Sequence, residues 1–265
     1  REQLSETQQK LAAEVQKARQ QHMELYSRNE ALRTALQDTS TRLDDYRQGL
    51  QTLEQRMEMD TLFGPETDLE SRLDAASQTV AERQVMLSAI PSGMPVDFQG
   101  ITSPYGMRTH PVTGKREKHK GIDMRAKTGT PVVATADGVV EYAGYHRKDG
   151  YGNLLVLSHD FGFKSYYAHL DDFGVRVGEY VRKGQVVAYT GNTGLSSGPH
   201  LHYEVNHLYR KLDPEPFIHW TMDNYQAIFE KENSVKWDSL AAIVKRQVAR
   251  TAPRSSEKTL ASTAN

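Results

Sequence analysis

The sequence contains no cysteine. Disulfides, thiolate ligands and a cysteine nucleophile are therefore excluded, and any metal would be held by His, Asp or Glu. It also lacks an apolar run long enough to span a bilayer. An excess of charge is absent too, with 33 Lys and Arg against 34 Asp and Glu, so no nucleic-acid partner is indicated. The 265 residues can form one well-packed core and an additional element.

Neither glycine nor proline occurs before Gly49, and residues 4–57 keep one seven-residue register. The d positions are Leu4, Leu11, Ala18, Leu25, Leu32, Thr39, Tyr46 and Leu53, and the a positions are Gln8, Val15, His22, Asn29, Leu36, Leu43, Leu50 and Met57. This pattern predicts a long coiled-coil helix. We interpret His22 and Asn29 as residues that restrict register and partner, rather than as metal ligands.

The heptad pattern ends at residues 61–67, where Gly64-Pro65 ends a helix and Thr67 could cap the next one. A second amphipathic stretch follows at 68–89. Because the connection is short, we favour an antiparallel helical hairpin. The alternative is a parallel homodimer through the long helix.

A Pro- and Gly-containing boundary at 90–95 separates this helical part from a region of short β-type runs. The predicted strands are 131–135, 138–143, 154–158, 164–170, 185–190 and 200–205. They predict an antiparallel all-β domain that ends near Trp220. Beyond it, apolar residues at helical spacing predict a helix at 234–250, and the Ser/Thr/Ala-rich end predicts disorder.

The expected fold class is therefore α+β, with a helical hairpin, an antiparallel β domain and a short helical tail. The expected boundaries are 1–90 for the hairpin, 91–100 for a linker, 101–220 for the β domain, 221–250 for the helical extension and 251–265 for a disordered tail.

The strand predicted at 200–205 carries the first candidate functional residues. Side chains alternate along a strand, so His200, His202 and Glu204 share one face, and the apolar residues between them pack on the other. A second cluster is at 119–123, where His119 and Asp123 share a face at a spacing of four. These two clusters bring imidazoles and carboxylates into one domain.

These residues form a plausible zinc site. Catalytic zinc usually takes three protein ligands and keeps a fourth position for water. His119, Asp123 and one of His200 or His202 could supply the three ligands. The remaining imidazoles, with His169 at a strand end, could act as general base or stabilise an oxyanion. The spacing does not choose between His200 and His202, and a chance grouping of surface histidines is also compatible with it.

Several motifs in order resemble the LytM/lysostaphin-type zinc endopeptidases, which cut peptide bonds in peptidoglycan. The similar segments are 103–111 (SPYGMRTHP), 119–123 (HKGID), 167–170 (YAHL), 191–194 (GNTG) and 196–204 (SSGPHLHYE). The resemblance covers about 101–220, and its specificity comes from the combination of motifs rather than from any one of them.

The resemblance implies a role for each of five residues. His119, Asp123 and His202 would hold one zinc ion per chain, and His169 and His200 would flank it as catalytic residues. One of these two would assist deprotonation of water and the other would stabilise the tetrahedral intermediate. The motifs do not assign which histidine has which role. The implied fold is a small antiparallel sheet with the site in a groove, whose floor is the 200–205 strand.

Because all five positions are filled, the resemblance implies an active zinc metalloendopeptidase. A coiled coil ahead of the domain resembles envelope-anchored enzymes of Gram-negative bacteria, which cut D-alanyl–diaminopimelate cross-links. The alternative is a non-catalytic regulator that activates another cell-wall hydrolase through its coiled coil.

The resemblance also sets expectations for location and partners. We expect a periplasmic or cell-envelope protein, held at the inner membrane by an anchoring segment ahead of Arg1. The expected partners are the peptides of peptidoglycan and an envelope or division-complex protein bound through the coiled coil. We also consider that the hairpin or the 234–250 helix covers the groove.

Overall fold

The computed structural model describes residues 2–59, 67–109 and 114–251. The chain divides into two compact units, 1–73 and 74–265. The predicted turn at 61–67 and the predicted disordered tail fall almost entirely outside the described residues. In the part of the chain that is described, no helix has the length and apolar character needed to cross a membrane.

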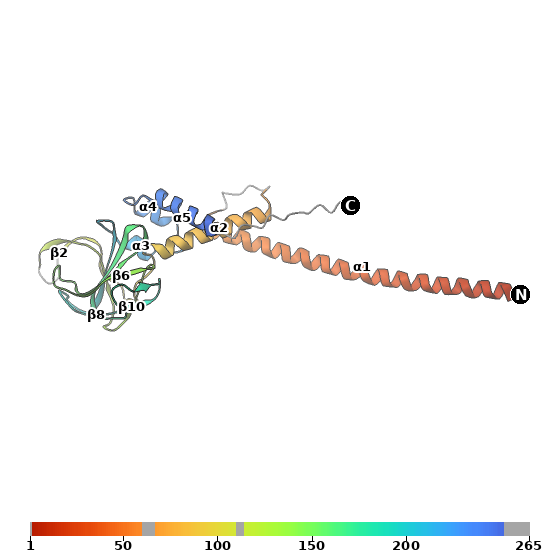
Figure 1. Ribbon diagram of the computed structural model, residues 1–265, viewed down its shortest axis with the longest axis horizontal. Helices are drawn as coiled ribbons and strands as arrows, with labels where there is room; N and C mark the ends of the chain where they lie inside the picture. Colours follow the sequence, from red (N-terminus) through yellow and green to blue (C-terminus); the bar gives the residue numbers. More distant parts are fainter. Residues whose placement is uncertain (1, 60–66, 110–113, 252–265) are drawn as a thin grey trace. The chain divides into compact units, whose positions relative to one another are not determined.

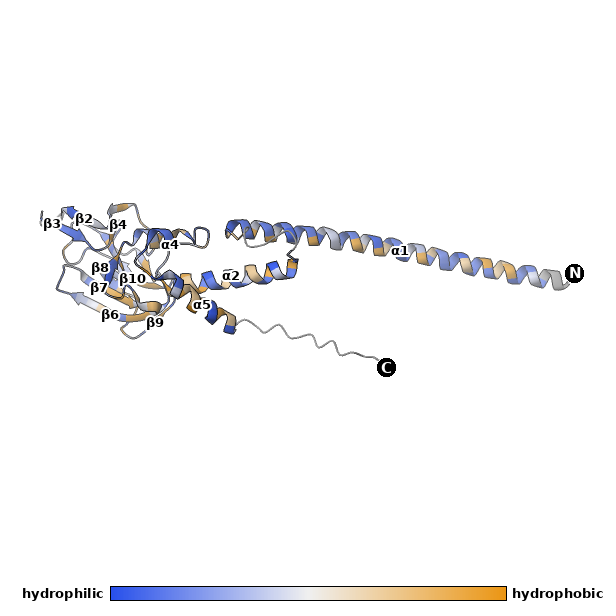
Figure 2. Ribbon diagram, turned by 90° about the horizontal axis from the view of Figure 1, so that it is seen from above, coloured by the Kyte–Doolittle hydropathy of each residue, from blue (hydrophilic) through white to orange (hydrophobic). Residues whose placement is uncertain are grey.

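The first unit is dominated by one long helix, α1 (Glu2–Arg56). Its sequence is rich in good helix formers and has no proline, and pairs such as Arg42–Asp38 (3.1 Å) support it along its surface. Figure 2 shows a mostly hydrophilic ribbon with apolar positions at intervals. The heptad leucines from Leu11 to Leu43 are exposed. The long helix is therefore observed, whereas its pairing as a coiled coil remains a prediction.

Within the first unit, one polar contact joins the two helices. Arg72, in the first turn of α2 (Leu69–Ala89), donates from Nε to Oε1 of the buried Glu54 at 3.0 Å. This contact holds the start of α2 beside the last turn of α1. The arrangement of the remainder of the predicted hairpin stays a prediction.

The second unit is built around an antiparallel sheet with the strand order β1-β4-β11-β8-β7-β6-β9, in which β12 pairs with β11 and β10 pairs with β5 and β8. The strands are β1 (Ile101–Ser103), β2 (Gly106–Thr109), β3 (Arg116–His119), β4 (Ile122–Arg125), β5 (Pro131–Val133), β6 (Gly138–His146), β7 (Gly152–Ser158), β8 (Phe163–Phe173), β9 (Tyr180–Val181), β10 (Val186–Thr190), β11 (His200–His207) and β12 (Arg210–Leu212). A short 3₁₀ turn, η1 (Asp160–Gly162), precedes β8. The predicted α+β class and antiparallel β domain are confirmed.

All six predicted strands are present, but β1–β4, β9 and β12 were not anticipated. These strands have two to four residues, and β3 reads Arg-Glu-Lys-His, without the alternation that marks a half-buried strand. They exist through pairing: β2 with β3, and β4 with β11. Tertiary contacts, rather than local pattern, therefore create the strands that carry the first histidine and the aspartate.

The core of this unit extends beyond the predicted β domain. Met86 and Ile90, at the end of α2, and Trp237 and Val244 of α5 (Trp237–Thr251) belong to the same buried cluster as the sheet. The short helices α3 (Glu215–Ile218) and α4 (Ala227–Lys231) lie beside the sheet with α5 (Figure 1). The segment expected as a linker, 91–100, also packs on the sheet: Ser92 N donates to Thr135 O at 2.9 Å.

Candidate metal centre

The pairing of two strands brings the first and last motifs together. In the antiparallel β4–β11 ladder, His202 is directly opposite Asp123. His119 ends β3, and the chain passes from it to β4 across Gly121. A Cβ at Gly121 would lie 2.3 Å from the carbonyl oxygen of Tyr203. Only glycine therefore allows this connection to approach β11 closely enough to place His119 over the sheet.

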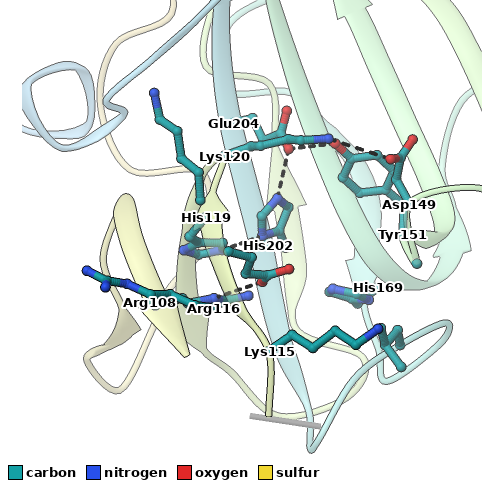
Figure 3. A pocket seen from close by; sticks show the side chains of 14 residues that line it. Arg108, Lys115, Arg116, His119, Lys120, Asp149, Tyr151, His169, His202 and Glu204 are labelled. Carbon is teal, nitrogen blue, oxygen red and sulfur yellow. Dashed lines mark hydrogen bonds and ion pairs between the residues drawn. The ribbon is translucent and has the colours of Figure 1, made fainter. Parts of the chain in front are cut away.

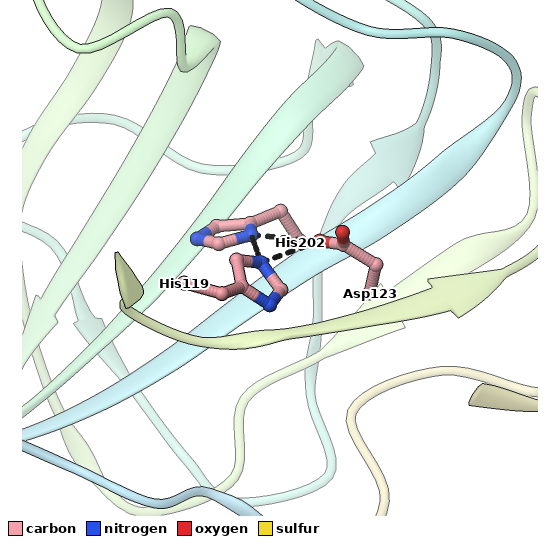
Figure 4. Close-up of side chains that lie close together, drawn as sticks. All are labelled: His119, Asp123 and His202. Atoms are coloured by element: carbon pink, nitrogen blue, oxygen red, sulfur yellow. Dashed lines mark hydrogen bonds and ion pairs between the residues drawn. The ribbon is translucent and has the colours of Figure 1, made fainter. Parts of the chain in front are cut away.

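Three side-chain atoms converge at this place (Figure 4). His119 Nε2 is 3.0 Å from His202 Nδ1 and 3.2 Å from Asp123 Oδ1, and the latter two atoms are 2.8 Å apart. Ligand atoms about 2.0–2.1 Å from a tetrahedral zinc are roughly 3.3 Å from each other. All three residues are buried. The set therefore fits a single metal ion with three protein ligands.

Hydrogen bonds fix which nitrogen each histidine turns to this point. His119 Nδ1 donates to the carbonyl oxygen of Pro104 at 2.8 Å, and His202 Nε2 donates to Oε1 of Glu204 at 3.0 Å. Because a carbonyl and a carboxylate can only accept, His119 offers Nε2 and His202 offers Nδ1 to a metal. Burial acts to raise the pKa of Asp123, but hydrogen bonds from His119 and His202 hold it well below its usual range. Asp123 therefore stays ionised, as a ligand must be.

Glu204 is a fully buried carboxylate next to the candidate metal ligands. It accepts hydrogen bonds from His202, from the Tyr151 hydroxyl at 2.7 Å and from Lys211 Nζ. Burial acts to raise its pKa, but the hydrogen bond from His202 and the charge of Lys211 lower it to about 2. Glu204 is thus an ionised group that orients His202.

Arg108 and Tyr151 also belong to the site, and no sequence pattern singles them out. Arg108 Nη1 donates to Oδ2 of Asp123 at 2.7 Å and to Ser103 Oγ at 2.8 Å. This pair holds the carboxylate so that Oδ1 turns to the histidines. The available signal is the position of Arg108 inside the motif at 103–111, but the motif itself does not show that Arg108 of β2 reaches Asp123 of β4.

The two remaining predicted residues lie beside the metal centre. The rings of His169 and His200 are 4.6 Å apart, and His200 Nε2 is 3.6 Å from Asp123 Oδ1. His169 Nδ1 donates to Thr193 O at 2.8 Å and His200 Nδ1 donates to Gly198 O at 2.7 Å. In both rings, the Nε2 atom is therefore the one left to act on a substrate.

His169 has further features of a functional residue. Its backbone has a φ of 59°, a left-handed conformation that is uncommon for a side chain of this size. Burial is the main cause that lowers the pKa of His169 to about 4, and the nearby His200 and His202 lower it further. The ring is therefore neutral near pH 7, and its Nε2 carries a lone pair.

Two cavities lie on either side of these residues and share Arg108, His169 and Leu195. One, of about 540 Å³, contains His119, His202, Tyr151 and Glu204 (Figure 3), and the other, of about 400 Å³, contains Asp123 and His200. A peptide lying along both would pass over the metal centre. None of the residues of α5 lines either cavity, and Trp237, Val244 and Val248 are buried in the core instead. The hypothesis that the 234–250 helix covers the groove is therefore wrong for this structure.

Comparison with known proteins agrees with this geometry. Residues 117–214 match the model of peptidase family M23. The chain is 47% identical over 110 residues to the DD-carboxypeptidase/endopeptidase Mpg of Neisseria meningitidis, which covers 42% of this chain and 25% of that protein. It is 41% identical over 111 residues to the peptidoglycan DD-endopeptidase ShyC of Vibrio cholerae, again 42% of this chain and 25% of the relative. The chain thus spans about a quarter of the length of these curated relatives.

A solved structure, a zinc-containing peptidase from Vibrio cholerae, is 40% identical, with a TM-score of 0.43 over 47% of this chain and 39% of that one. The family match begins inside β3 and ends at Pro214, so it contains all five predicted site residues. The β domain of this chain belongs to peptidase family M23, the family of LytM and lysostaphin.

Proposed function

We propose that this protein is a zinc-dependent endopeptidase that cleaves peptide cross-links of peptidoglycan. The observation that carries the proposal is the convergence of His119 Nε2, Asp123 Oδ1 and His202 Nδ1 within 3.2 Å of one another. Two imidazoles and one carboxylate are a ligand set typical of catalytic zinc, which keeps its fourth position open. One ion per chain is expected, because the described residues contain one such group.

When bound, zinc polarises the scissile carbonyl and lowers the pKa of water. The chain's own residues supply the rest of the chemistry. His169 and His200 present Nε2 beside the ligands. One accepts the proton from the attacking water, and the other, in its imidazolium form with Nε2 protonated, donates a hydrogen bond to the oxyanion of the tetrahedral intermediate. Glu204 and Arg108 keep His202 and Asp123 oriented throughout.

For the substrate, we propose the D-alanyl–diaminopimelate cross-link. Relatives of the β domain carry the name DD-endopeptidase, and this cross-link joins two D-configured centres. Its peptides also carry free carboxylates, which suit the cationic side of the larger cavity, where Arg116, Lys118 and Lys120 are exposed. A protein that acts on this substrate works in the cell envelope, in the periplasm of a Gram-negative bacterium.

The alternative, a non-catalytic activator of another hydrolase, is not favoured. A regulator has no need of a complete ligand set, whereas here all three ligands and both flanking histidines are present and oriented by hydrogen bonds. The relatives named above are also enzymes by name.

The test is digestion of purified sacculi with His119→Ala and Asp123→Ala variants. Each should lose bound zinc and cross-link cleavage, because two ligands do not hold the ion. His219→Ala, which removes an exposed histidine of the same domain, should keep both. Zinc is measured by elemental analysis and the products by muropeptide identification. Full cleavage by a zinc-free variant would contradict the proposal, and products cut at another bond would contradict the substrate alone.

A further inference from the structure

The charges that border the heptad seam of α1 have an unusual distribution. In a coiled coil, the e and g positions lie beside the a and d core and meet the partner helix. The e positions are Ser5, Ala12, Arg19, Tyr26, Arg33, Ser40, Arg47 and Glu54, and the g positions are Thr7, Glu14, Gln21, Arg28, Ala35, Arg42, Gly49 and Arg56. Every arginine of α1 is at one of these positions.

The acidic residues of the same stretch lie elsewhere. From residue 22 to residue 47, they are Glu24, Glu30, Asp38, Asp44 and Asp45, all at the outer b and c positions. The lysines Lys10 and Lys17 are also at c positions. The seam of the helix is therefore flanked by positive charge over four heptads, and its negative charge lies on the outside.

The seam itself is open in the described residues. Leu11, Leu25, Leu32, Leu36 and Leu43 are between 41% and 73% exposed. A row of leucines at heptad spacing gains stability only when it is covered, since a long helix in water owes most of its stability to the packing of its apolar face.

A second copy of this chain is a poor fit to the seam. In a parallel in-register dimer, each g residue meets the e residue five positions later on the other helix. Arg28 would face Arg33 of the second copy, and Arg42 would face Arg47, each pair twice. Against these two repulsive pairs stands one attractive pair, Glu14 with Arg19. In an antiparallel dimer, e faces e and g faces g, which again brings arginines together.

Contacts within the helix do not remove this repulsion. Arg33, Arg42 and Arg47 pair with acidic residues one turn away on the outer face, at 3.5, 3.1 and 3.4 Å. These pairs are exposed, and such pairs contribute little and weaken with salt. They supply no attraction between two helices of the same sequence.

We infer that the seam of α1 binds a helix of a different protein whose own e and g positions are acidic. Such a helix covers the leucine row and places a carboxylate opposite each arginine. Asn29, at an a position, favours a polar a residue at the facing position and so sets the register. This inference does not depend on the peptidase activity of the β domain.

The test uses two synthetic peptides of residues 22–57. The first carries Arg28→Glu, Arg33→Glu, Arg42→Glu and Arg47→Glu, and the second has the unaltered sequence. With the full chain at low salt, we expect fluorescence anisotropy to show the acidic peptide binding about tenfold or more tightly, since four Arg–Arg contacts become Arg–Glu contacts. The difference should shrink as salt is raised to about 0.5 M.

Variants of the full chain give an independent readout by analytical ultracentrifugation. The unaltered chain should be monomeric. Arg28→Glu with Arg42→Glu should weaken binding of the acidic peptide, because two of the four Arg–Glu contacts become Glu–Glu contacts. The same variant should gain self-association, because both repulsive pairs of the parallel dimer become attractive. Lys10→Glu with Lys17→Glu, the same change of charge on the outer face, should do neither. A salt-insensitive dimer of the unaltered chain, equal binding of the two peptides, or binding of neither would overturn the inference.

Discussion

Glu204 shows what a single buried residue contributes to the metal centre. Its carboxylate fixes the Nε2 hydrogen of His202, so that Nδ1 keeps its lone pair for the metal. Glu204→Gln should lower zinc affinity by about 10–100-fold, the range for loss of a partner behind a metal-binding histidine. Competition with a chromophoric chelator measures the affinity directly.

Tyr151→Phe is the matched control for this change. It removes one hydrogen bond to Glu204 and leaves the carboxylate and its contact with His202 in place. Its affinity should therefore fall much less. Unchanged affinity in Glu204→Gln would show that the tautomer of His202 does not depend on this carboxylate.

His159, far from the metal ligands, makes stability depend on pH. Burial lowers its pKa to about 4, and it is held by Asp137 O and by Ser165 Oγ. In the unfolded chain its pKa is about 6.5. As pH falls from about 6.5 to 4, the unfolded chain gains a proton that the folded chain does not, so the free energy of unfolding falls.

His159→Gln should remove this component. Between about pH 7 and pH 4.5, the variant should lose roughly 2 kcal/mol less stability than the unaltered chain, measured by urea unfolding. The other titrating groups are common to both proteins and cancel in the comparison. Equal losses in the two proteins would mean that His159 is charged in the folded state.

At the scale of elements, the close passage of the β3–β4 connection over β11 decides whether the centre forms. Gly121→Ala would place a Cβ 2.3 Å from Tyr203 O, a backbone atom that cannot move alone. We expect a loss of about 1–3 kcal/mol in stability and a clear loss of zinc affinity, since His119 and Asp123 would shift relative to His202.

Gly198→Ala is the control, because its Cβ would meet nothing within 4 Å and it also lies near the site. It should retain zinc affinity and stability close to the unaltered values. Thermal unfolding followed by circular dichroism and a metal titration distinguish the two glycines. Retention of zinc by Gly121→Ala would mean that the connection can be displaced without harm.

At the scale of the whole molecule, the folding unit is larger than the family match. The helices on either side contribute Met86, Ile90, Trp237 and Val244 to the core of the sheet. Burying one large apolar side chain contributes about 1.5–3 kcal/mol. A fragment of residues 101–220 should therefore lack a cooperative thermal transition, whereas a fragment of 74–251 should keep one near that of the full chain. Equal cooperativity in the two fragments would contradict this account.

The sequence alone determined those features that depend on local periodicity. A seven-residue repeat without glycine or proline is enough to predict α1, because helix formation and an apolar stripe are properties of neighbouring residues. Alternation along β11 places His200, His202 and Glu204 on one face for the same reason. The resemblance of the motifs indicates His202, rather than His200, as the third ligand. In the structure His202 is grouped with His119 and Asp123, and its role as a ligand stays a prediction.

Only the tertiary structure decided how these parts form a site. β3 and β4 are too short and too polar to be recognised in isolation, and they become strands by pairing with β2 and β11. Arg108 could not be assigned to Asp123 from spacing, because the two residues lie on strands of different sheets. Spacing also does not show which ring nitrogen of each histidine faces the candidate metal position. In His119 that nitrogen is Nε2, because Nδ1 donates to the carbonyl oxygen of Pro104, which is 15 residues away in the sequence. Local pattern determines which side chains share a face, whereas contacts between distant strands determine which atoms meet.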